Sequence, residues 1–173
     1  MGEVYEAEQT HPRRTVALKL IRTGLASAEG LKRFELEAEV LGRLQHPGIA
    51  QVYQAGTVQA AGGSRPFFVM EFVRGEPLNE YLARAKPRTE QRLLLLARVA
   101  DAVQHAHGKG VIHRDLKPAN IMITGGAEDP QPKVLDFGVA RLTGQDVQAV
   151  TLHTNVGQLI GTVPYMSPEQ AAG

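Results

Sequence analysis

The sequence predicts an α+β fold in two lobes, a small sheet lobe with one helix followed by a mainly helical lobe. Residues 3–73 contain strand-like runs of β-branched and apolar side chains around one amphipathic helix pattern. After the breaking sequence Arg74-Gly75-Glu76-Pro77, residues 78–107 follow helical spacing instead. We therefore expect one lobe over residues 1–73 and a second over residues 74–173.

Composition excludes several kinds of function. The 173 residues carry a formal net charge of +1 and no cysteine. Because acids and bases are balanced, we expect neither a nucleic-acid surface nor a basic membrane patch. The lack of cysteine excludes disulfides and thiolate metal sites, and no apolar run approaches the roughly 20 residues of a membrane span. We expect these residues to be cytoplasmic and to make no membrane contact.

Residues 15–21 form a strand pattern with a single charge, Lys19. Alternation places Lys19 on the same face as Ala17, a small residue that leaves room for a ligand. In the helix expected over residues 27–45, Glu37 lies within the apolar stripe, where an unpaired member of a buried ion pair costs about 3–5 kcal/mol. Lys19 is the candidate partner. The alternative, equally weighted, is that Glu37 reaches solvent at the edge of the stripe.

The rest of the chain is expected to contain both strands and helices. Strands are expected over residues 49–58, 67–73, 121–124 and 133–135, and helices over residues 78–85 and 89–107. In the longer helix Thr89 is the expected N-cap, and the apolar stretch Leu93–Val103 predicts central burial. His105 and His107 point apart at its end, so we predict no metal site there. Residues 138–165, with weak periodicity, are expected to form a functional loop.

The chemistry concentrates in His113–Asn120 and in Asp136-Phe137-Gly138. These two motifs place two acids, an amide and a lysine at fixed offsets. Carboxylate and amide oxygens suit a hard cation such as Mg²⁺. This pattern is typical of enzymes that transfer a phosphoryl group from a metal-bound nucleotide.

The motifs stand in an order that resembles the protein kinases, specifically their serine/threonine branch. The other matching segments are Gly2-x-Val4, Val16-Ala17-Leu18-Lys19, Glu37, Met70-Glu71 and Ser167-Pro168-Glu169. Residues 161–170 resemble the eukaryotic-like bacterial members of that branch. The resemblance implies a bilobal protein-kinase-like fold with a small antiparallel β lobe. Because the chain begins inside the family's glycine-rich loop and ends shortly after Glu169, we expect an incomplete catalytic domain, truncated at both ends, with about two-thirds of the usual fold.

The resemblance also implies catalytic roles. Asp115 would orient the attacking hydroxyl, and Lys117 would contact the γ-phosphate of ATP. Asn120 and Asp136 would be the ligands of Mg²⁺, with Mn²⁺ as an alternative metal.

The nucleotide would lie between the two lobes. Lys19 would contact its α- and β-phosphates and be held in place by Glu37. The full set of residues that the resemblance assigns to the nucleotide is Gly2, Val4, Ala17, Lys19, Met70, Glu71, Val73, Met122 and Asp136. Within this set, Val4 and Ala17 would sandwich the adenine, and Met70 would close the back of the pocket. Plain core packing is the alternative explanation of Val4 and Met70.

Two further features follow from the resemblance. The backbone groups of Glu71 and Val73 would hydrogen-bond the edge of the base. Leu41, Phe137 and His113 would stack into an internal spine, so His113 is expected to be structural.

Regulation is predicted for the activation segment. Arg114 would pair with a phosphorylated residue there, since a phosphate brings a charge of about −1.5 to −2. We hypothesise autophosphorylation at Thr154, with Thr151 close by. Thr162 is expected to contact Asp115 and to shape the substrate site.

Two hypotheses for function stay open. In the first, the chain represents a kinase that transfers the γ-phosphate of ATP to serine and threonine hydroxyls, with ATP and protein substrates as partners and dimerisation as a further interaction. In the second, it is a truncated or degenerate kinase-like module that binds nucleotide or a protein partner without catalysis. A domain without its later helices would expose the apolar face of residues 93–103. A full-length parent could be anchored to a membrane through a later segment.

Overall fold

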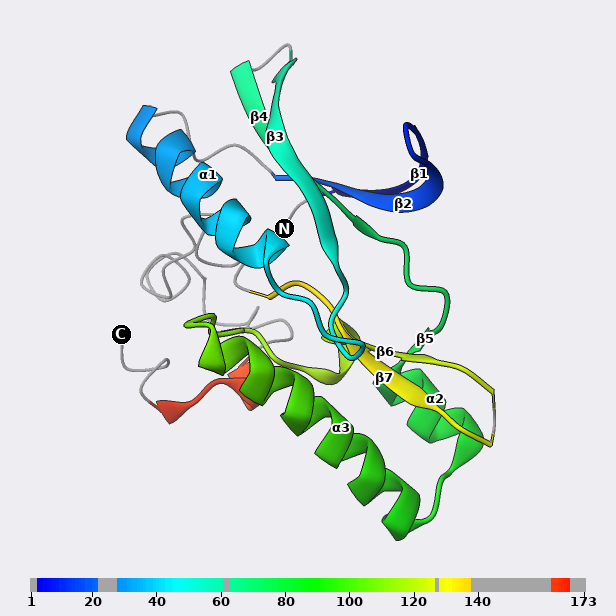
Figure 1. Ribbon diagram of the computed structural model, residues 1–173. Coiled ribbons are helices and arrows are strands. Elements are labelled where there is room, and N and C mark those ends of the chain that lie inside the picture. Colours follow the sequence, from blue (N-terminus) through cyan, green and yellow to red (C-terminus); the bar gives the residue numbers. More distant parts are fainter. Residues whose placement is uncertain (1–2, 22–27, 61–62, 127, 138–162, 169–173) are drawn as a thin grey trace, which may run out of the picture.

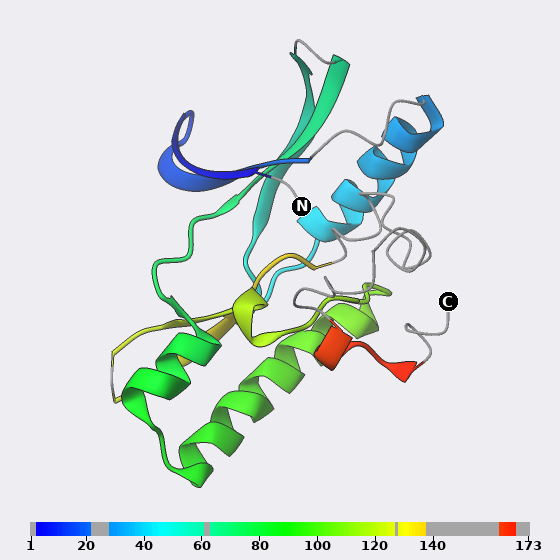
Figure 2. The ribbon, with the colours of Figure 1, turned by 180° about the vertical axis from the view of Figure 1, so that it is seen from behind.

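The computed structural model of the chain describes residues 3–21, 28–60, 63–126, 128–137 and 163–168. Figure 1 shows two groups of elements, a sheet with one helix at the top and two helices with a smaller sheet at the bottom. Figure 2 shows the same division from behind. The predicted α+β fold in two lobes is therefore confirmed, and the expected boundary after residue 73 lies in the connection between the two sheets.

The upper sheet is antiparallel, with strand order β1-β2-β4-β3. Its strands are β1 (Glu3–Thr10), β2 (Arg13–Leu20), β3 (Val52–Ala60) and β4 (Gly63–Glu71). In its register Val4 lies opposite Lys19, and Ala17 lies opposite Met70. The strand expected from residue 49 begins only at Val52, because Ile49 instead forms a parallel bridge with Val134 of the other lobe.

Helix α1 (Ala28–Gly42) packs on this sheet through apolar residues at helical spacing. Phe34, Ala38 and Leu41 are buried, and the Phe34 ring lies 5.0 Å from the ring of Phe68 on β4. Residues three and four positions apart share one face of a helix, which is why this spacing predicted the buried side.

The lower lobe combines a three-stranded antiparallel sheet with two helices. The sheet contains β5 (Glu76–Pro77), β6 (Ile121–Thr124) and β7 (Gln131–Val134), in that order, and the helices are α2 (Leu78–Ala85) and α3 (Thr89–Gly108). Short 3-10 helices, η1 (Pro118–Asn120) and η2 (Val163–Tyr165), complete the described part of the chain. No helix within the described ranges is long and apolar enough to cross a membrane.

Helix α3 is not the centrally buried helix that its apolar composition predicted. It buries one face, formed by Leu95, Val99, Ala102 and Ala106. The leucines at 93, 94 and 96 are instead 61, 55 and 56 % exposed, because α3 packs against β7 on one side and no described element covers the other. The separate expectation that this chain would expose the face of residues 93–103 is confirmed at these three leucines.

The start of α3 also differs in detail from the prediction. Arg88 is the N-cap and Thr89 the first helical residue. The backbone N–H of Arg88 donates to the Gln91 side chain at 2.9 Å, so a glutamine satisfies the helix start where a threonine hydroxyl was expected.

Candidate active site

The two motifs singled out in the sequence meet at the ends of neighbouring segments. Residues 113–120 connect α3 to β6, and residues 135–137 directly follow β7. The backbone N–H of Leu135 donates to the carbonyl of Asn120 at 2.8 Å. Antiparallel pairing of β6 with β7 therefore brings Asn120 and Asp136 to the same end of the small sheet.

Asp115 is held by two of the residues predicted to act with it. Its Oδ2 atom accepts from Lys117 Nζ at 2.8 Å and from Asn120 Nδ2 at 3.2 Å. The Asn120 amide also donates to the backbone carbonyl of Asp115 at 2.8 Å. The loop thus fixes the carboxylate through one oxygen.

The second oxygen of Asp115 has a different environment. Oδ1 is buried and has no hydrogen-bond partner in the structure as described. A buried acceptor without a donor costs about 1–3 kcal/mol, so such atoms concentrate at sites of function. A substrate hydroxyl would supply the missing donor.

His113 is structural, as expected. Its side chain is 3 % exposed, and its ring lies 4.8 Å from that of Phe137. Nε2–H donates to the Leu135 carbonyl at 2.8 Å, while Nδ1 accepts from the N–H of Asp115 at 3.3 Å. One ring nitrogen donates and the other accepts, which defines a neutral imidazole. Burial lowers its pKa below the usual value, against the smaller raising effect of the hydrogen bond to Leu135.

Lys19 pairs with a different acid from the one predicted. Its Nζ lies 2.7 Å from Oδ2 of Asp136, and the two side chains are only 13 and 29 % exposed. Among the residues that the structure describes, no ion pair joins Lys19 to Glu37, so the predicted pairing is wrong for this conformation. Helical spacing placed Glu37 on the inner side of α1 but carried no information on the distance between α1 and β2.

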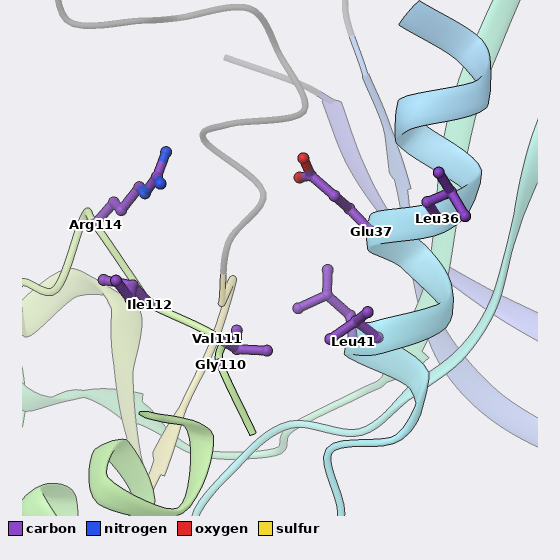
Figure 3. A pocket seen from close by; sticks show the side chains of 8 residues that line it. Leu36, Glu37, Leu41, Gly110, Val111, Ile112 and Arg114 are labelled. Atoms are coloured by element: carbon purple, nitrogen blue, oxygen red, sulfur yellow. The ribbon is translucent and has the colours of Figure 1, made fainter. Parts of the chain in front are cut away.

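Glu37 lies at the edge of a separate hollow between α1 and residues 110–114. The hollow has a volume of about 250 Å³, and Leu36, Val40 and Ile112 contribute apolar walls. Figure 3 shows Glu37 projecting from α1 into this space, with Arg114 on the opposite wall. The structure therefore brings the predicted regulatory arginine and the predicted partner of Lys19 to one hollow.

Two motif residues adopt left-handed backbone conformations. Arg114 has φ of +66° and Asp136 has φ of +60°. This region is sparsely populated by residues other than glycine and costs of order 1 kcal/mol or more. Such conformations cluster at functional sites, and the Asp136 side chain is in addition held by its ion pair with Lys19.

The residues assigned to the nucleotide lie on strands of both sheets and in the segments that directly follow β4 and β7. Val4 is 60 % exposed on β1 opposite Lys19, whereas Met70 is buried opposite Ala17. The Glu71 N–H already donates to the Gln51 carbonyl at 2.8 Å, so this N–H is not available to a base. These positions agree with a nucleotide site, but the individual roles stay predictions.

Two further residues assigned to the nucleotide, Val73 and Met122, are half-buried. Val73 is half-buried in the connection that follows β4, and Met122 is half-buried on β6 opposite Lys133. Gly2, Thr151, Thr154 and Thr162 lie outside the described residues.

The donor set fits a magnesium ion. Because the Asn120 amide nitrogen donates to Asp115, the Asn120 side-chain oxygen is left for a metal. Asp136, at the same end of the small sheet, would add a carboxylate. Mg²⁺ takes one or two protein oxygens and completes its shell with water and phosphate. Within the described ranges no group of three or more His, Asp or Glu side chains could hold a metal.

Sequence reasoning missed two residues near the site, Gln51 and Lys133. Lys133 Nζ contacts Oε1 of Glu71 at 2.5 Å, and Oε2 of Glu71 accepts from the N–H of Gln51 at 3.2 Å. The available signal was the single charged residue, Lys133, in the strand predicted over residues 133–135, as with Lys19 in residues 15–21.

Comparison with known proteins gives one consistent answer. A family model described as "Protein kinase domain" matches residues 1–172. Over the full chain, the serine/threonine-protein kinase pkn3 of Myxococcus xanthus is 43% identical, and serine/threonine-protein kinase PknA of Mycobacterium tuberculosis is 40% identical. The chain covers 31% and 39% of these two proteins.

A solved kinase structure is also similar to this chain. The crystal structure of the Mycobacterium tuberculosis PknI kinase domain matches 81% of this chain with a TM-score of 0.65 and 33% identity. The chain covers 56% of that domain. It therefore spans less than two thirds of each of these relatives, and the likeness confirms the predicted protein-kinase-like fold.

Proposed function

Because this chain belongs to the protein kinase family, we propose that it forms the catalytic cleft of a kinase that transfers the γ-phosphate of ATP to serine or threonine hydroxyls of proteins. The observation that carries the proposal is the environment of Asp115. One carboxylate oxygen is fixed by Lys117 and Asn120, and the other is a buried acceptor with no partner within the described chain.

In this proposal Asp115 orients the substrate hydroxyl. Oδ1 accepts its hydrogen bond, which directs the oxygen at the γ-phosphorus. A bond forms between that oxygen and phosphorus, the bond to the β,γ-bridging oxygen breaks, and the hydroxyl proton passes toward Asp115. Lys117, which contacts the same carboxylate, would stabilise the charge on the transferring phosphoryl oxygens.

Kinases generally use ATP with Mg²⁺, and this chain offers residues for both. Asn120 and Asp136 would hold the metal, which would neutralise charge on the phosphates. Lys19 would bind the phosphates themselves. Since Lys19 and Asp136 contact each other at 2.7 Å, nucleotide binding requires that Lys19 exchange or share this contact.

The regulatory roles remain part of the proposal. Arg114 lines the hollow that Glu37 enters, and a cationic side chain there suits a phosphorylated threonine. Thr154, with Thr151 as the neighbouring candidate, is the proposed acceptor. Phosphopeptide mapping after incubation with ATP and Mg²⁺ is expected to find phosphate at Thr154; phosphate only outside residues 136–169 would contradict this.

The exposed leucines of α3 favour a second candidate, a module that binds nucleotide or protein without catalysis. Phosphate transfer from labelled ATP to a generic basic protein separates the two. The Asp115→Asn variant is expected to bind nucleotide normally but to lose transfer, whereas Asp129→Asn, an exposed acid of the β6–β7 connection, should retain it. Equal transfer by wild type and Asp115→Asn would reject the catalytic proposal.

A further inference from the structure

We propose that Gln51, Glu71 and Lys133 form a clamp that sets the distance between the base-binding and the metal-binding ends of the nucleotide site. Its kinetic consequence rests on the proposed function. Lys133 and Gln51 act through other groups and are positioning residues.

The centre of the clamp is the Glu71 carboxylate, which joins two lobes. Lys133 Nζ on β7 contacts Oε1 at 2.5 Å, and the Gln51 N–H donates to Oε2 at 3.2 Å. In turn, the Glu71 N–H donates a hydrogen bond to the Gln51 carbonyl at 2.8 Å. Every hydrogen-bonding group of Glu71 except its carbonyl is therefore committed to the clamp.

The clamp extends to the C-terminal end of α1. Gln51 Nε2 donates to the carbonyl of Gly42, the last residue of α1, at 3.1 Å. A carbonyl in the last turn of a helix lacks an intrahelical donor, so this bond caps α1. The helix that carries Glu37 is thus tied, through Gln51, to the end of β4 and to β7.

Backbone bonds reinforce the same junction. The Ala50 N–H donates to the Val134 carbonyl at 2.9 Å, and the Val134 N–H donates to the Gly48 carbonyl at 2.8 Å. In Figure 1 the connection between α1 and β3 lies against β7. The Glu71–Lys133 pair joins the same two segments, because Glu71 also accepts from the N–H of Gln51, the residue after Ala50.

Burial makes the ion pair more than a surface contact. The Lys133 and Glu71 side chains are 18 and 28 % exposed. Exposed pairs are weak, whereas removing one partner of a shielded pair leaves the other charge without compensation. Loss of Lys133 alone should therefore disturb the position of Glu71.

The two ends that the clamp joins are both assigned to the nucleotide. Glu71 offers its carbonyl to the base, and Asp136 follows Lys133 by three residues. A loosened clamp weakens contacts that the ground state and the transition state share, which lowers nucleotide affinity with little change in the transfer rate. This distinguishes positioning of the nucleotide from catalysis.

The test compares Lys133→Met, the charge-retaining Lys133→Arg and the control Arg98→Met in the 173-residue chain. Arg98 pairs with Asp129 at 3.1 Å within the lower lobe and touches neither Gln51 nor Glu71. Titration with a fluorescent ADP analogue and Mg²⁺ should show about three- to tenfold weaker binding for Lys133→Met. Lys133→Arg and Arg98→Met should stay within about twofold of wild type.

Hydrogen exchange supplies a readout that does not need nucleotide. Lys133→Met should speed exchange of the amides of residues 50–52 and 134–137, and Arg98→Met should not. If Lys133→Met folds poorly, Glu71→Gln replaces it, because that variant removes the charge but keeps an oxygen for the Gln51 N–H. The double variant Glu71→Gln/Lys133→Met should bind nucleotide no more weakly than either single variant.

The outcomes separate the clamp from the proposed function. Weaker nucleotide binding by Lys133→Met supports the clamp even if wild type transfers no phosphate, a result that would reject only the proposed function. Unchanged exchange at residues 50–52 would overturn the clamp whatever the transfer assay gives. Faster transfer at unchanged nucleotide affinity would overturn it too, because the pair would then restrain α1 instead of positioning the nucleotide.

Discussion

The ammonium of Lys19 lies 2.7 Å from the carboxylate of Asp136, which ties β2 to the segment that follows β7. Both side chains are largely shielded from water, so each compensates the charge of the other. This contact replaces the Lys19–Glu37 pair expected from the sequence, and it joins the predicted phosphate ligand directly to a predicted metal ligand.

A double-mutant cycle on Lys19→Met and Asp136→Asn should therefore show coupling. We expect the two changes to be non-additive in the free energy of unfolding, with an interaction of about 1 kcal/mol measured by urea denaturation. The same cycle on the exposed pair Arg13 and Glu8 should give a smaller interaction. Additive effects for Lys19 and Asp136 would show that their contact contributes no stability.

Asn120→Ala should reduce phosphate transfer by about 10²-fold or more, because it removes both the bond that fixes Asp115 and the proposed metal ligand. The matched control is Asn79→Ala, which changes an exposed residue of α2. Initial rates at saturating ATP and Mg²⁺ measure both variants. Comparable rates for Asn120→Ala and Asn79→Ala would show that Asn120 has no catalytic role.

His113 should make stability depend on pH. Its pKa is lowered in the folded state, chiefly by burial, so the unfolded chain binds the proton more tightly. The stabilisation is present above the unfolded pKa of about 6.5 and is lost as pH falls below it toward the folded pKa.

Urea denaturation between pH 5 and 8 tests this dependence. The loss of stability below about pH 6.5 should be smaller in His113→Gln than in wild type. His107→Gln, which changes an exposed residue at the end of α3, should keep the wild-type dependence. Identical pH profiles for wild type and His113→Gln would refute the assignment.

The exposed leucines of α3 should promote self-association. Replacing Leu93, Leu94 and Leu96 together by Gln is expected to reduce concentration-dependent association in sedimentation velocity, at little cost in stability. Leu95→Ala is the contrasting variant, since Leu95 is buried and its truncation should cost about 2–5 kcal/mol. Association that is unaffected by the triple substitution would place the contact elsewhere.

Local pattern predicted the elements of this fold well. The spacing of Phe34, Ala38 and Leu41 gave the buried face of α1, and the order of the motifs gave the bilobal fold. The apolar run of α3 led to a wrong prediction of central burial. Composition indicates how much of a helix surface can be buried, but it does not show how many other elements pack against that helix.

The pairing of charges across elements was the least predictable feature. The sequence suggested only Glu37 as the partner of Lys19, whereas the structure pairs Lys19 with Asp136. Which acid lies closer depends on the position of α1 relative to β2, and local sequence does not specify it. The contact of Lys133 with Glu71 joins residues 62 positions apart, and nothing in either local sequence specifies it. Asp115, Lys117 and Asn120, in contrast, lie within one short loop, so their contacts could be expected from spacing.

The most direct test of the account is the identity of the amino acids that this chain phosphorylates, and their dependence on Asp115. Incubation with γ-labelled ATP, Mg²⁺ and a basic protein substrate, followed by phosphoamino-acid analysis, should find label on serine or threonine. The label should fall to background in Asp115→Asn, which retains nucleotide binding. Equal labelling by Asp115→Asn, or no labelling by a wild-type chain that binds nucleotide, would contradict the proposed catalytic role of this site.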